Sequence, residues 1–244
     1  MDKTKTVSKE EIKFLEGPQS RWKEFKFTLG VLFDFIRGFR SLHFVGPCVT
    51  IFGSARFKED HIYYKKTVEI AGEIARLGFT IMTGGGPGIM EAGNRGAREV
   101  GGRSVGCNII LPHEQHHNPY LDKWVDIKFF FVRKTLLIKY SYAFIVMPGG
   151  FGTLDEYFEA LTLIQTKMIF EFPIIIFDTE YHKEIIEHIE MMKRKGTISP
   201  EDMKLCLFTD SVPEAVKHLQ QHSINKFGLK AEQKRTRMKW LFEK

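Results

Sequence analysis

Hydrophobic residues follow one spacing near the start of the chain and another through its middle. Within residues 22–40, apolar side chains recur every three or four positions, at Phe25, Leu29, Leu32, Phe33 and Ile36. This spacing places them on one face of a helix. We therefore expect an amphipathic helix before the main domain, packed on the body of the protein or on a partner subunit.

After residue 46, short β-branched or aromatic runs alternate with longer helical stretches. The expected strands are residues 49–52, 79–82, 104–110, 127–131, 143–147, 174–177 and 205–208. The expected helices are residues 63–77, 88–100, 153–168, 181–194 and 212–221. This alternation predicts an α/β fold with a mostly parallel sheet and crossover helices, and such sheets bind ligands at the carboxyl ends of their strands.

Length and charge divide the chain into three parts. Its 244 residues fit one globular domain at 46–224, preceded by a helical extension at 1–45 and followed by a basic tail at 225–244. The net charge is +6, but residues 46–224 hold 20 basic and 22 acidic residues, so a basic groove for nucleic acid is not indicated. A structural or nucleic-acid-associated role would rest on the basic ends alone.

The remaining composition indicates a cytoplasmic protein without a membrane partner. No apolar run approaches the roughly 20 residues that span a bilayer, and the first residues are polar rather than like a secretory signal. The three cysteines, Cys48, Cys107 and Cys206, are scattered within or beside apolar runs. We expect them to be buried, reduced thiols.

Two glycine-rich loops each follow an expected strand and open an expected helix. The first runs from Gly84 to Met90, and the second runs from Pro148 to Glu156. Glycine lets the backbone approach an anion closely, and a helix start offers unpaired N–H groups and a positive dipole end. Both loops therefore predict phosphate binding, although each could also be only a tight strand-to-helix turn.

Neither loop carries the signature of a common nucleotide fold. No G-x-G-x-x-G register fits them, and neither contains the Lys-Ser/Thr pair of a P-loop. Chemistry that depends on NAD or ATP therefore loses support.

The motifs resemble those of the LOG family, cytokinin-activating phosphoribohydrolases that are often mislabelled as lysine decarboxylases. The sequence from Pro148 to Glu156, PGGFGTLDE, stands in the P-G-G-x-G-T-x-x-E position of that family. Arg133 and Lys134 precede Pro148 at matching spacing, and the triple glycine 84–86 also matches. The resemblance is strongest to the larger bacterial branch and covers residues 49–177.

The resemblance implies a Rossmann-like three-layer sandwich and hydrolysis of the N-glycosidic bond of AMP or N6-substituted AMP, giving free base and ribose 5-phosphate. It implies that Arg133 and Glu156 are the catalytic pair, and that no metal or cofactor is needed. It also implies a homodimer or higher homo-oligomer. The expected substrate-binding residues are Ser54, Gly84, Gly85, Gly86, Gly88, Ile89, Met90, Glu114, Lys134, Gly149, Gly150, Phe151, Gly152, Thr153, Leu154, Asp155 and Thr162.

Several of these residues also have a purely structural interpretation. Thr153 and Glu156 fit the S/T-x-x-E capping box, so Glu156 could simply cap a helix. Arg133 could be a surface arginine before a helix, and Ser54 is equally well read as a helix N-cap.

Two other chemistries and one non-catalytic role are the alternatives to this function. His113-Glu114-Gln115-His116-His117 contains H-E-x-x-H, but flanking prolines leave little room for the helix that a zinc site requires. Lysine decarboxylation would need pyridoxal phosphate on a lysine, and no lysine stands out. A non-catalytic nucleotide or molybdenum-cofactor carrier of the same superfamily stays open as the alternative function.

Overall fold

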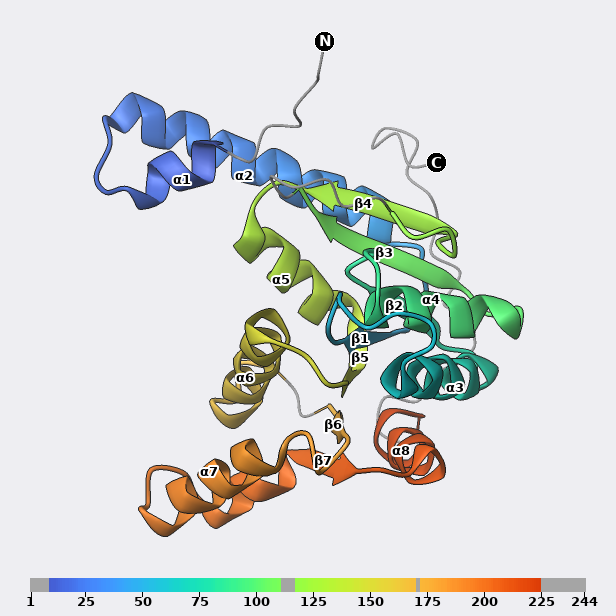
Figure 1. Ribbon diagram of the computed structural model, residues 1–244. Coiled ribbons are helices and arrows are strands. Elements are labelled where there is room, and N and C mark those ends of the chain that lie inside the picture. Colours follow the sequence, from blue (N-terminus) through green and yellow to red (C-terminus); the bar gives the residue numbers. More distant parts are fainter. Residues whose placement is uncertain (1–8, 111–116, 170–171, 225–244) are drawn as a thin grey trace.

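A seven-stranded parallel sheet forms the centre of the protein in the computed structural model, which describes residues 9–110, 117–169 and 172–224 (Figure 1). Its strands are β1 (Cys48–Phe52), β2 (Thr80–Thr83), β3 (Ser104–Ile109), β4 (Lys123–Ile127), β5 (Ser141–Val146), β6 (Ile174–Phe177) and β7 (Cys206–Thr209). They lie in the order β4-β3-β2-β1-β5-β6-β7, and every pairing is parallel. The predicted α/β fold class is confirmed.

Helices cover both faces of this sheet and make a three-layer sandwich. The α-helices are α1 (Lys9–Leu15), α2 (Arg21–Leu42), α3 (Ile62–Arg76), α4 (Ile89–Glu99), α5 (Phe130–Tyr140), α6 (Phe151–Gln165), α7 (Lys183–Arg194) and α8 (Val212–Leu219). Two short helical turns, η1 (Pro200–Lys204) and η2 (Gln220–Ile224), complete the described elements. The core on one face takes side chains from α2, α5, α6 and α7, and the core on the other face takes them from α3, α4 and α8.

Burial on both faces explains why the central strands are mostly apolar. Every residue of β1, β2, β3 and β6 is buried. Parallel strands covered by helices on both sides read as continuous hydrophobic runs rather than as alternating ones. Those runs are what made most of the strands predictable.

The prediction of a strand at residues 127–131 was wrong, and a helix at this position was missed. The fourth strand in the chain, β4, ends at Ile127, and α5 begins at Phe130. As an edge strand, β4 buries only Val125 and Ile127, so it lacks the long apolar run of the central strands. Phe130 and Phe131 look like strand residues, but they lie partly exposed in the first turn of α5. The remaining predicted strands and helices match observed elements within a few residues at each end.

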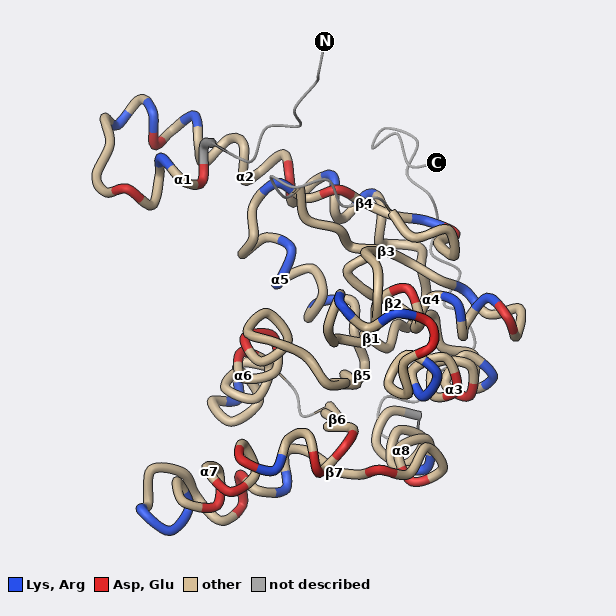
Figure 2. Tube along the Cα trace, viewed as in Figure 1, with Lys and Arg blue, Asp and Glu red and all other residues tan. Residues whose placement is uncertain are grey.

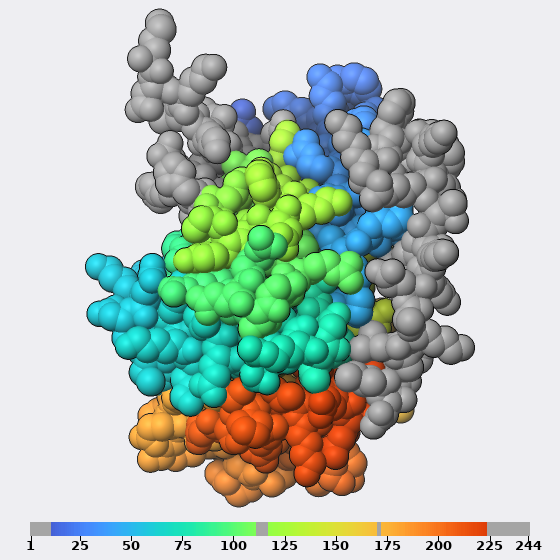
Figure 3. Space-filling view, turned by 90° about the vertical axis from the view of Figure 1, so that its right-hand side faces the viewer, coloured from blue at the N-terminus to red at the C-terminus, as the bar shows by residue number. Residues whose placement is uncertain are grey.

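The order in which strands are added to the sheet changes direction at the neighbouring strands β1 and β5. Strands β1 to β4 are added toward one edge, and β5, β6 and β7 are added toward the other. In Figure 3, which shows one side of the molecule, the colours pass from the blue N-terminal helices at the top through green and cyan to the orange-red α8 at the bottom. In open parallel sheets, the crevice at such a reversal is the usual ligand site. The loops after β1 and β5 are therefore expected to bind a ligand.

Helix α2 is joined to the sheet by a buried carboxylate. Asp34 is only 2% exposed, and its Oδ2 accepts hydrogen bonds from the backbone N–H groups of Lys128 and Phe129, at 2.6 and 3.1 Å. Phe129 is the N-cap of α5 and cannot cap that helix with its own side chain. A carboxylate at a helix start satisfies free N–H groups and faces the positive end of the dipole. The N-terminal extension therefore fixes the start of α5.

Positions of Lys or Arg and of Asp or Glu are mixed along the surface helices, as α3 and α7 illustrate (Figure 2). The basic tail predicted at residues 225–244 lies outside the described residues. Within the described ranges, no helix is both long enough and apolar enough to cross a membrane.

We expect Asp34→Ala to lower the free energy of unfolding by about 2 kcal/mol, because it leaves two backbone N–H groups at the start of α5 without their acceptor. Urea titration followed by circular dichroism would measure the change. Glu69→Ala, which breaks an exposed ion pair with Lys66, is the control and should change stability by less than about 0.5 kcal/mol. Equal losses in the two variants would contradict the capping role.

Candidate functional site

The loop after β1 brings the two glycine loops together. The backbone N–H of Ser54 donates to the carbonyl of Pro148 at 3.0 Å, and the Ser54 carbonyl accepts from the N–H of Ile89 at 3.0 Å. Ser54 is therefore bonded to the start of the second loop and to the first residue of α4. The two segments predicted to bind phosphate converge on one place at the carboxyl edge of the sheet.

The glycines of the first loop are required mainly by the conformation and close packing of the loop itself. Gly85 and Gly88 have positive φ angles of 75° and 68°, which residues with a side chain rarely adopt. A Cβ on Gly88 would also lie 2.5 Å from the Ser54 carbonyl oxygen, and a Cβ on Gly84 would overlap the guanidinium of Arg133. These glycines let the loop, Ser54 and Arg133 approach each other closely.

A buried polar network that the sequence reading missed holds this first loop. The Asn118 side chain donates to the Gly86 carbonyl at 3.1 Å, and its backbone N–H donates to the Gly85 carbonyl at 3.0 Å. Asn118 also donates to Asn94 Oδ1 at 2.9 Å, and the Thr83 hydroxyl donates to the same oxygen at 2.6 Å. Buried amides with full sets of partners fix one conformation. The loop is therefore held in place before any ligand arrives.

The glycines of the second loop are of two kinds. A Cβ on Gly149 would collide with the side chain of Thr153, so this position is required by packing. A Cβ on Gly150 or Gly152 would meet nothing within 4 Å, and neither residue has a positive φ. Gly152 lies in the first turn of α6, where glycine is a poor helix former. The fold does not require these two glycines, whereas close approach of a ligand would.

The start of α6 is suited to an anion. Gly150 is its N-cap and offers no side chain, and the first turn of the helix contains no acidic residue. The N–H groups at this end point toward the open space above Gly150 and Gly152. Tyr181 stabilises the loop, because its hydroxyl donates a hydrogen bond to the Gly149 carbonyl at 2.8 Å. No motif pointed to this tyrosine.

Two of the structural alternatives for site residues are wrong. Because α6 begins at Phe151, Thr153 is its third residue rather than its N-cap, and Glu156 lies beyond the capping position. Ser54 is not a helix N-cap, because the helix that follows it, α3, is capped by His61. The Ser54 hydroxyl instead accepts a hydrogen bond from the backbone N–H of Arg56 at 3.1 Å.

Arg133 lies buried at the centre of the site and is not a surface arginine. It is 8% exposed, and its Nε donates to the carbonyl of Cys107, within β3, at 2.9 Å. One terminal nitrogen lies 3.3 Å from Oε1 of Glu156, and the other lies beside Gly84. The guanidinium thus touches the sheet, the first glycine loop and α6.

Glu156 is the partner of this arginine and has a strongly shifted pKa. Its side chain is 11% exposed. Burial raises the pKa of Glu156 to about 7, although the charge of Arg133 opposes the rise and that of Asp155 adds to it. A carboxyl group that titrates near neutrality can hold or release a proton at working pH.

Lys134 forms a second ion-pair group on the outer side of Glu156. Its Nζ lies 3.0 Å from both carboxylate oxygens of Asp155 and 3.0 Å from Oε2 of Glu159. Burial lowers the pKa of Lys134, but the hydrogen bonds to Glu159 and Asp155 outweigh it and raise the pKa overall. This cation is paired with two acidic residues of α6, Asp155 and Glu159.

The other predicted residues lie at varying distances from this centre. Ile89 is buried, Met90 Sδ lies against Gly84, and Leu154 is half-buried in α6. Phe151 is 93% exposed, and Thr162 lies in the last turn of α6 with its hydroxyl bonded to the Phe158 carbonyl. None of the hydrogen bonds found between described residues links Thr162 to the glycine loops. Glu114 lies outside the described residues.

A further cluster of polar side chains lies beside the first loop, near the carboxyl ends of β3 and β4. Asn108 donates to Asp126 at 3.1 Å, and His117 Nε2 lies 2.7 Å from the same carboxylate oxygen. The buried Oδ1 of Asn108 has no hydrogen-bond partner among the described residues. Most of the H-E-x-x-H segment lies outside those residues, and no group of three His, Cys, Asp or Glu side chains within them could hold a metal ion.

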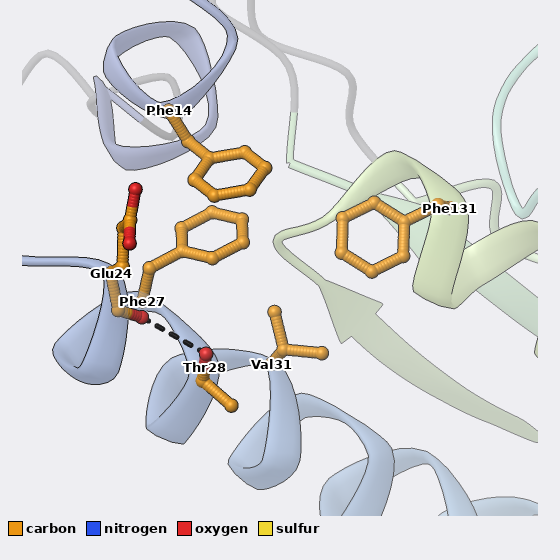
Figure 4. Close-up of a pocket in the computed structure, with 6 residues that line it drawn as sticks. All are labelled: Phe14, Glu24, Phe27, Thr28, Val31 and Phe131. Atoms are coloured by element: carbon orange, nitrogen blue, oxygen red, sulfur yellow. Dashed lines mark hydrogen bonds between the residues drawn. The ribbon is translucent and has the colours of Figure 1, made fainter. Parts of the chain in front are cut away.

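A pocket of about 450 Å³ lies elsewhere, between α1, α2 and the start of α5 (Figure 4). Phe14 stacks on Phe27 there with ring centroids 4.0 Å apart, and Phe131 faces them. Its lining includes neither glycine loop, Arg133 nor Glu156. It is therefore separate from the candidate site.

The model of the family described as "possible lysine decarboxylase" matches residues 90–219, which is more than half of the chain. The chain belongs to this family, the LOG family. The matched part of this LOG-family chain contains Arg133, Lys134, Glu156 and the whole second glycine loop, and it begins inside the first loop.

Curated relatives agree with this membership. A cytokinin riboside 5′-monophosphate phosphoribohydrolase from Mycobacterium tuberculosis is 31% identical over 61% of this chain and 81% of its own length. One from Rhodococcoides fascians is 29% identical over 62% of this chain and 78% of that protein. One from Arabidopsis thaliana is 25% identical over 70% of this chain and 80% of its own.

Solved structures support the fold of this LOG-family protein. The molybdenum cofactor binding protein of Rippkaea orientalis superposes with a TM-score of 0.55 at 18% identity, covering 72% of this chain and 96% of that one. The molybdenum cofactor carrier protein of Chlamydomonas reinhardtii gives 0.54 at 20% identity, covering 72% and 97%. At this identity the likeness concerns the fold alone.

Alanine at Gly149 and at Gly150 should separate the two kinds of glycine. We expect Gly149→Ala to lower the free energy of unfolding by about 1–3 kcal/mol, because the new methyl group collides with Thr153. Gly150→Ala should leave stability within about 0.5 kcal/mol but weaken phosphate binding roughly tenfold or more, because its methyl group enters the open space. Urea denaturation and calorimetric titration with inorganic phosphate measure the two effects. Unchanged phosphate affinity in Gly150→Ala would contradict the anion site.

Proposed function

We propose that this protein hydrolyses the N-glycosidic bond of a nucleoside 5′-monophosphate, AMP or N6-substituted AMP, and releases the free base and ribose 5-phosphate. The observation that carries the proposal is the buried Arg133–Glu156 pair, which lies beside an anion-binding helix start. The names of the curated relatives support the same substrate class. The reaction needs no metal and no cofactor.

In this proposal, the 5′-phosphate binds at the start of α6. The N–H groups of the first turn and the bare backbone of Gly150 and Gly152 receive its oxygens, and the helix dipole favours its charge. The first glycine loop closes the opposite side through its backbone link to Ser54. The phosphate then anchors the ribose at a fixed distance from Glu156, which lies one turn further along α6.

Glu156 would perform the chemistry at the anomeric carbon. Cleavage of an N-glycosidic bond develops positive charge on the ribose ring, and a carboxylate beside the ring stabilises that charge. The same carboxylate can take a proton from the attacking water, since its pKa of about 7 suits proton transfer at neutral pH. The water oxygen bonds to the anomeric carbon, and the base leaves with the electron pair of the broken C–N bond and takes up one proton, so that the sum is one water consumed. Arg133 orients the carboxylate through its hydrogen bond and is itself held by the Cys107 carbonyl.

We expect Glu156→Gln to lower kcat for AMP hydrolysis by about 10²–10⁴-fold, because the amide can neither carry negative charge nor accept the proton. The AMP dissociation constant should change by less than about tenfold, since the phosphate contacts remain. Chromatography of released adenine and calorimetric titration with AMP measure the two quantities. Glu187→Gln, on the exposed side of α7, is the matched control and should behave like the native chain.

Two outcomes would overturn the assignment. If Glu156→Gln cleaves AMP at the native rate, Glu156 is not the catalytic carboxylate. If the native chain binds AMP or its N6-isopentenyl analogue but releases no base from either, the protein is a carrier of a phosphorylated ligand rather than a hydrolase.

The rate should depend on pH through Glu156. The raised pKa means that the carboxyl group is protonated below about 7, so kcat at saturating AMP should fall about tenfold per pH unit below pH 6 and level off above pH 8. Saturating substrate is needed because the phosphate of free AMP also titrates near pH 6. A kcat that stays constant from pH 5 to pH 8 would contradict an ionised Glu156 as the active form.

A further inference from the structure

Two successive carbonyl groups at the start of the second glycine loop are held from opposite sides. The Pro148 carbonyl accepts from the backbone N–H of Ser54, in the loop after β1, at 3.0 Å. The Gly149 carbonyl accepts from the hydroxyl of Tyr181, in the segment after β6, at 2.8 Å. In the sheet, β1 and β6 lie on opposite sides of β5. The hydrogen bond from Tyr181 therefore holds the Gly149 carbonyl on the β6 side of the loop.

That hydrogen bond also fixes the direction of the next N–H group along the chain. The Gly149 carbonyl and the Gly150 N–H belong to one planar peptide unit, and no peptide bond among the described residues is cis. In a trans unit the C=O and N–H bonds point in opposite directions. The Gly150 N–H therefore points toward the β1 side, where Ser54 and the first glycine loop lie. None of the hydrogen bonds found among the described residues uses this N–H.

Glycine on both sides of this peptide unit makes a peptide flip possible. A flip rotates ψ of Gly149 and φ of Gly150 by about 180°, and it would bring φ of Gly150 from −96° to a positive value that glycine adopts readily. Nothing within 4 Å of the Cβ position of Gly150 would hinder the change. After a flip, a carbonyl oxygen rather than an N–H group would face the proposed phosphate position and would repel the anion. The orientation of this unit therefore needs a contact from outside the loop.

We propose that Tyr181 is a positioning residue whose hydroxyl prevents this flip and so keeps the Gly150 N–H directed at the 5′-phosphate of the substrate. The inference rests on the proposed function, because it requires that the phosphate binds at the start of α6. It also gives the site a means of selecting phosphorylated substrates. Adenosine has no phosphate to accept from the Gly150 N–H, so its binding does not depend on Tyr181.

Tyr181 is itself held in place by its neighbours. Its backbone N–H donates to Oδ1 of Asp178 at 2.8 Å. Its ring meets the Tyr63 ring edge-on with centroids 6.0 Å apart, and the His182 ring with centroids 5.0 Å apart. Asp178 follows β6 directly and has a φ of 76°, which residues other than glycine adopt only rarely. The hydroxyl is therefore in position before a ligand binds.

The hydroxyl of Tyr181 can be removed without disturbing the core of the protein. The residue is 42% exposed, and neither hydrophobic core includes it. Tyr181→Phe keeps the ring and its contacts and removes only the donor to the Gly149 carbonyl. The unfolding midpoint should therefore stay within about 4 °C of the native value.

Calorimetric titration of the full chain with inorganic phosphate, AMP and adenosine tests the proposal. In Tyr181→Phe we expect the dissociation constants of phosphate and AMP to rise about tenfold, because a donor to the anion is no longer held in place, and that of adenosine to stay within about twofold. The KM for AMP should rise with them, while kcat changes less than about threefold, since the catalytic pair is untouched. Tyr120→Phe is the matched control, because the Tyr120 hydroxyl makes no hydrogen bond within the described part of the chain.

Two tyrosine analogues separate the hydrogen bond from the shape of the ring. At position 181, 4-aminophenylalanine keeps an N–H donor in place of the hydroxyl, and we expect phosphate affinity within about threefold of the native value. At the same position 4-methoxyphenylalanine has no donor and should bind phosphate as weakly as Tyr181→Phe. Equal phosphate affinity in the two analogue proteins would contradict the hydrogen bond as the cause.

The results also separate this inference from the proposed function. If Tyr181→Phe binds phosphate and AMP as the native chain does, or loses as much affinity for adenosine as for AMP, the positioning role is wrong and the hydrolase assignment is unaffected. If the expected losses occur but the native chain releases no base from AMP, the positioning role holds and the hydrolase assignment is wrong. A native chain that binds neither phosphate nor AMP overturns both.

Discussion

The candidate site depends on one buried cation. A guanidinium removed from water must be surrounded by acceptors, and Arg133 meets this requirement with the carbonyl of Cys107 in β3 and the Glu156 carboxylate on α6. The third contact, with Gly84, tolerates no side chain on the loop. The position of Arg133 thus ties together a strand, a loop and a helix that lie far apart in the sequence.

The rest of the architecture keeps that cation in place. The reversal of strand order between β1 and β5 puts the second glycine loop next to Ser54, and Ser54 links it to the first. Asn94 and Asn118 fix the first loop, and Asp34 fixes the start of the helix that carries Arg133. The low-polarity surroundings that require Arg133 to be paired also raise the pKa of Glu156. The same low-polarity surroundings therefore keep Arg133 paired and shift the pKa of Glu156.

Much of this could be predicted from the sequence, because the features concerned are local. Central strands buried on both faces read as mostly apolar runs, and glycines at strand-to-helix junctions indicate an anion site. The edge strand β4 and helix α5 were misread, since Phe129, Phe130 and Phe131 mimic a buried strand while only Phe129 is fully buried. At the edge of the sheet, the position of the segment in the fold decided its secondary structure, and the local hydrophobic pattern did not.

Long-range contacts could not be predicted in this way. Asn94 looks like a surface residue of a helix, and its partners Thr83, Ser104 and Asn118 share no spacing that would connect them. The same holds for Tyr181 and the Gly149 carbonyl, which are 32 positions apart. Nor does the sequence separate Gly149, which packing requires, from Gly150 and Gly152, which face open space. Arg133 and Glu156 were found because they match a family motif.

The most direct test of this account is a crystal structure of the Glu156→Gln variant with AMP bound. The account predicts that the 5′-phosphate accepts hydrogen bonds from the N–H groups at the start of α6, above Gly150 and Gly152, and that the anomeric carbon of the ribose lies next to the side chain at position 156. AMP bound with its phosphate away from α6, or with the anomeric carbon beyond reach of position 156, would contradict it.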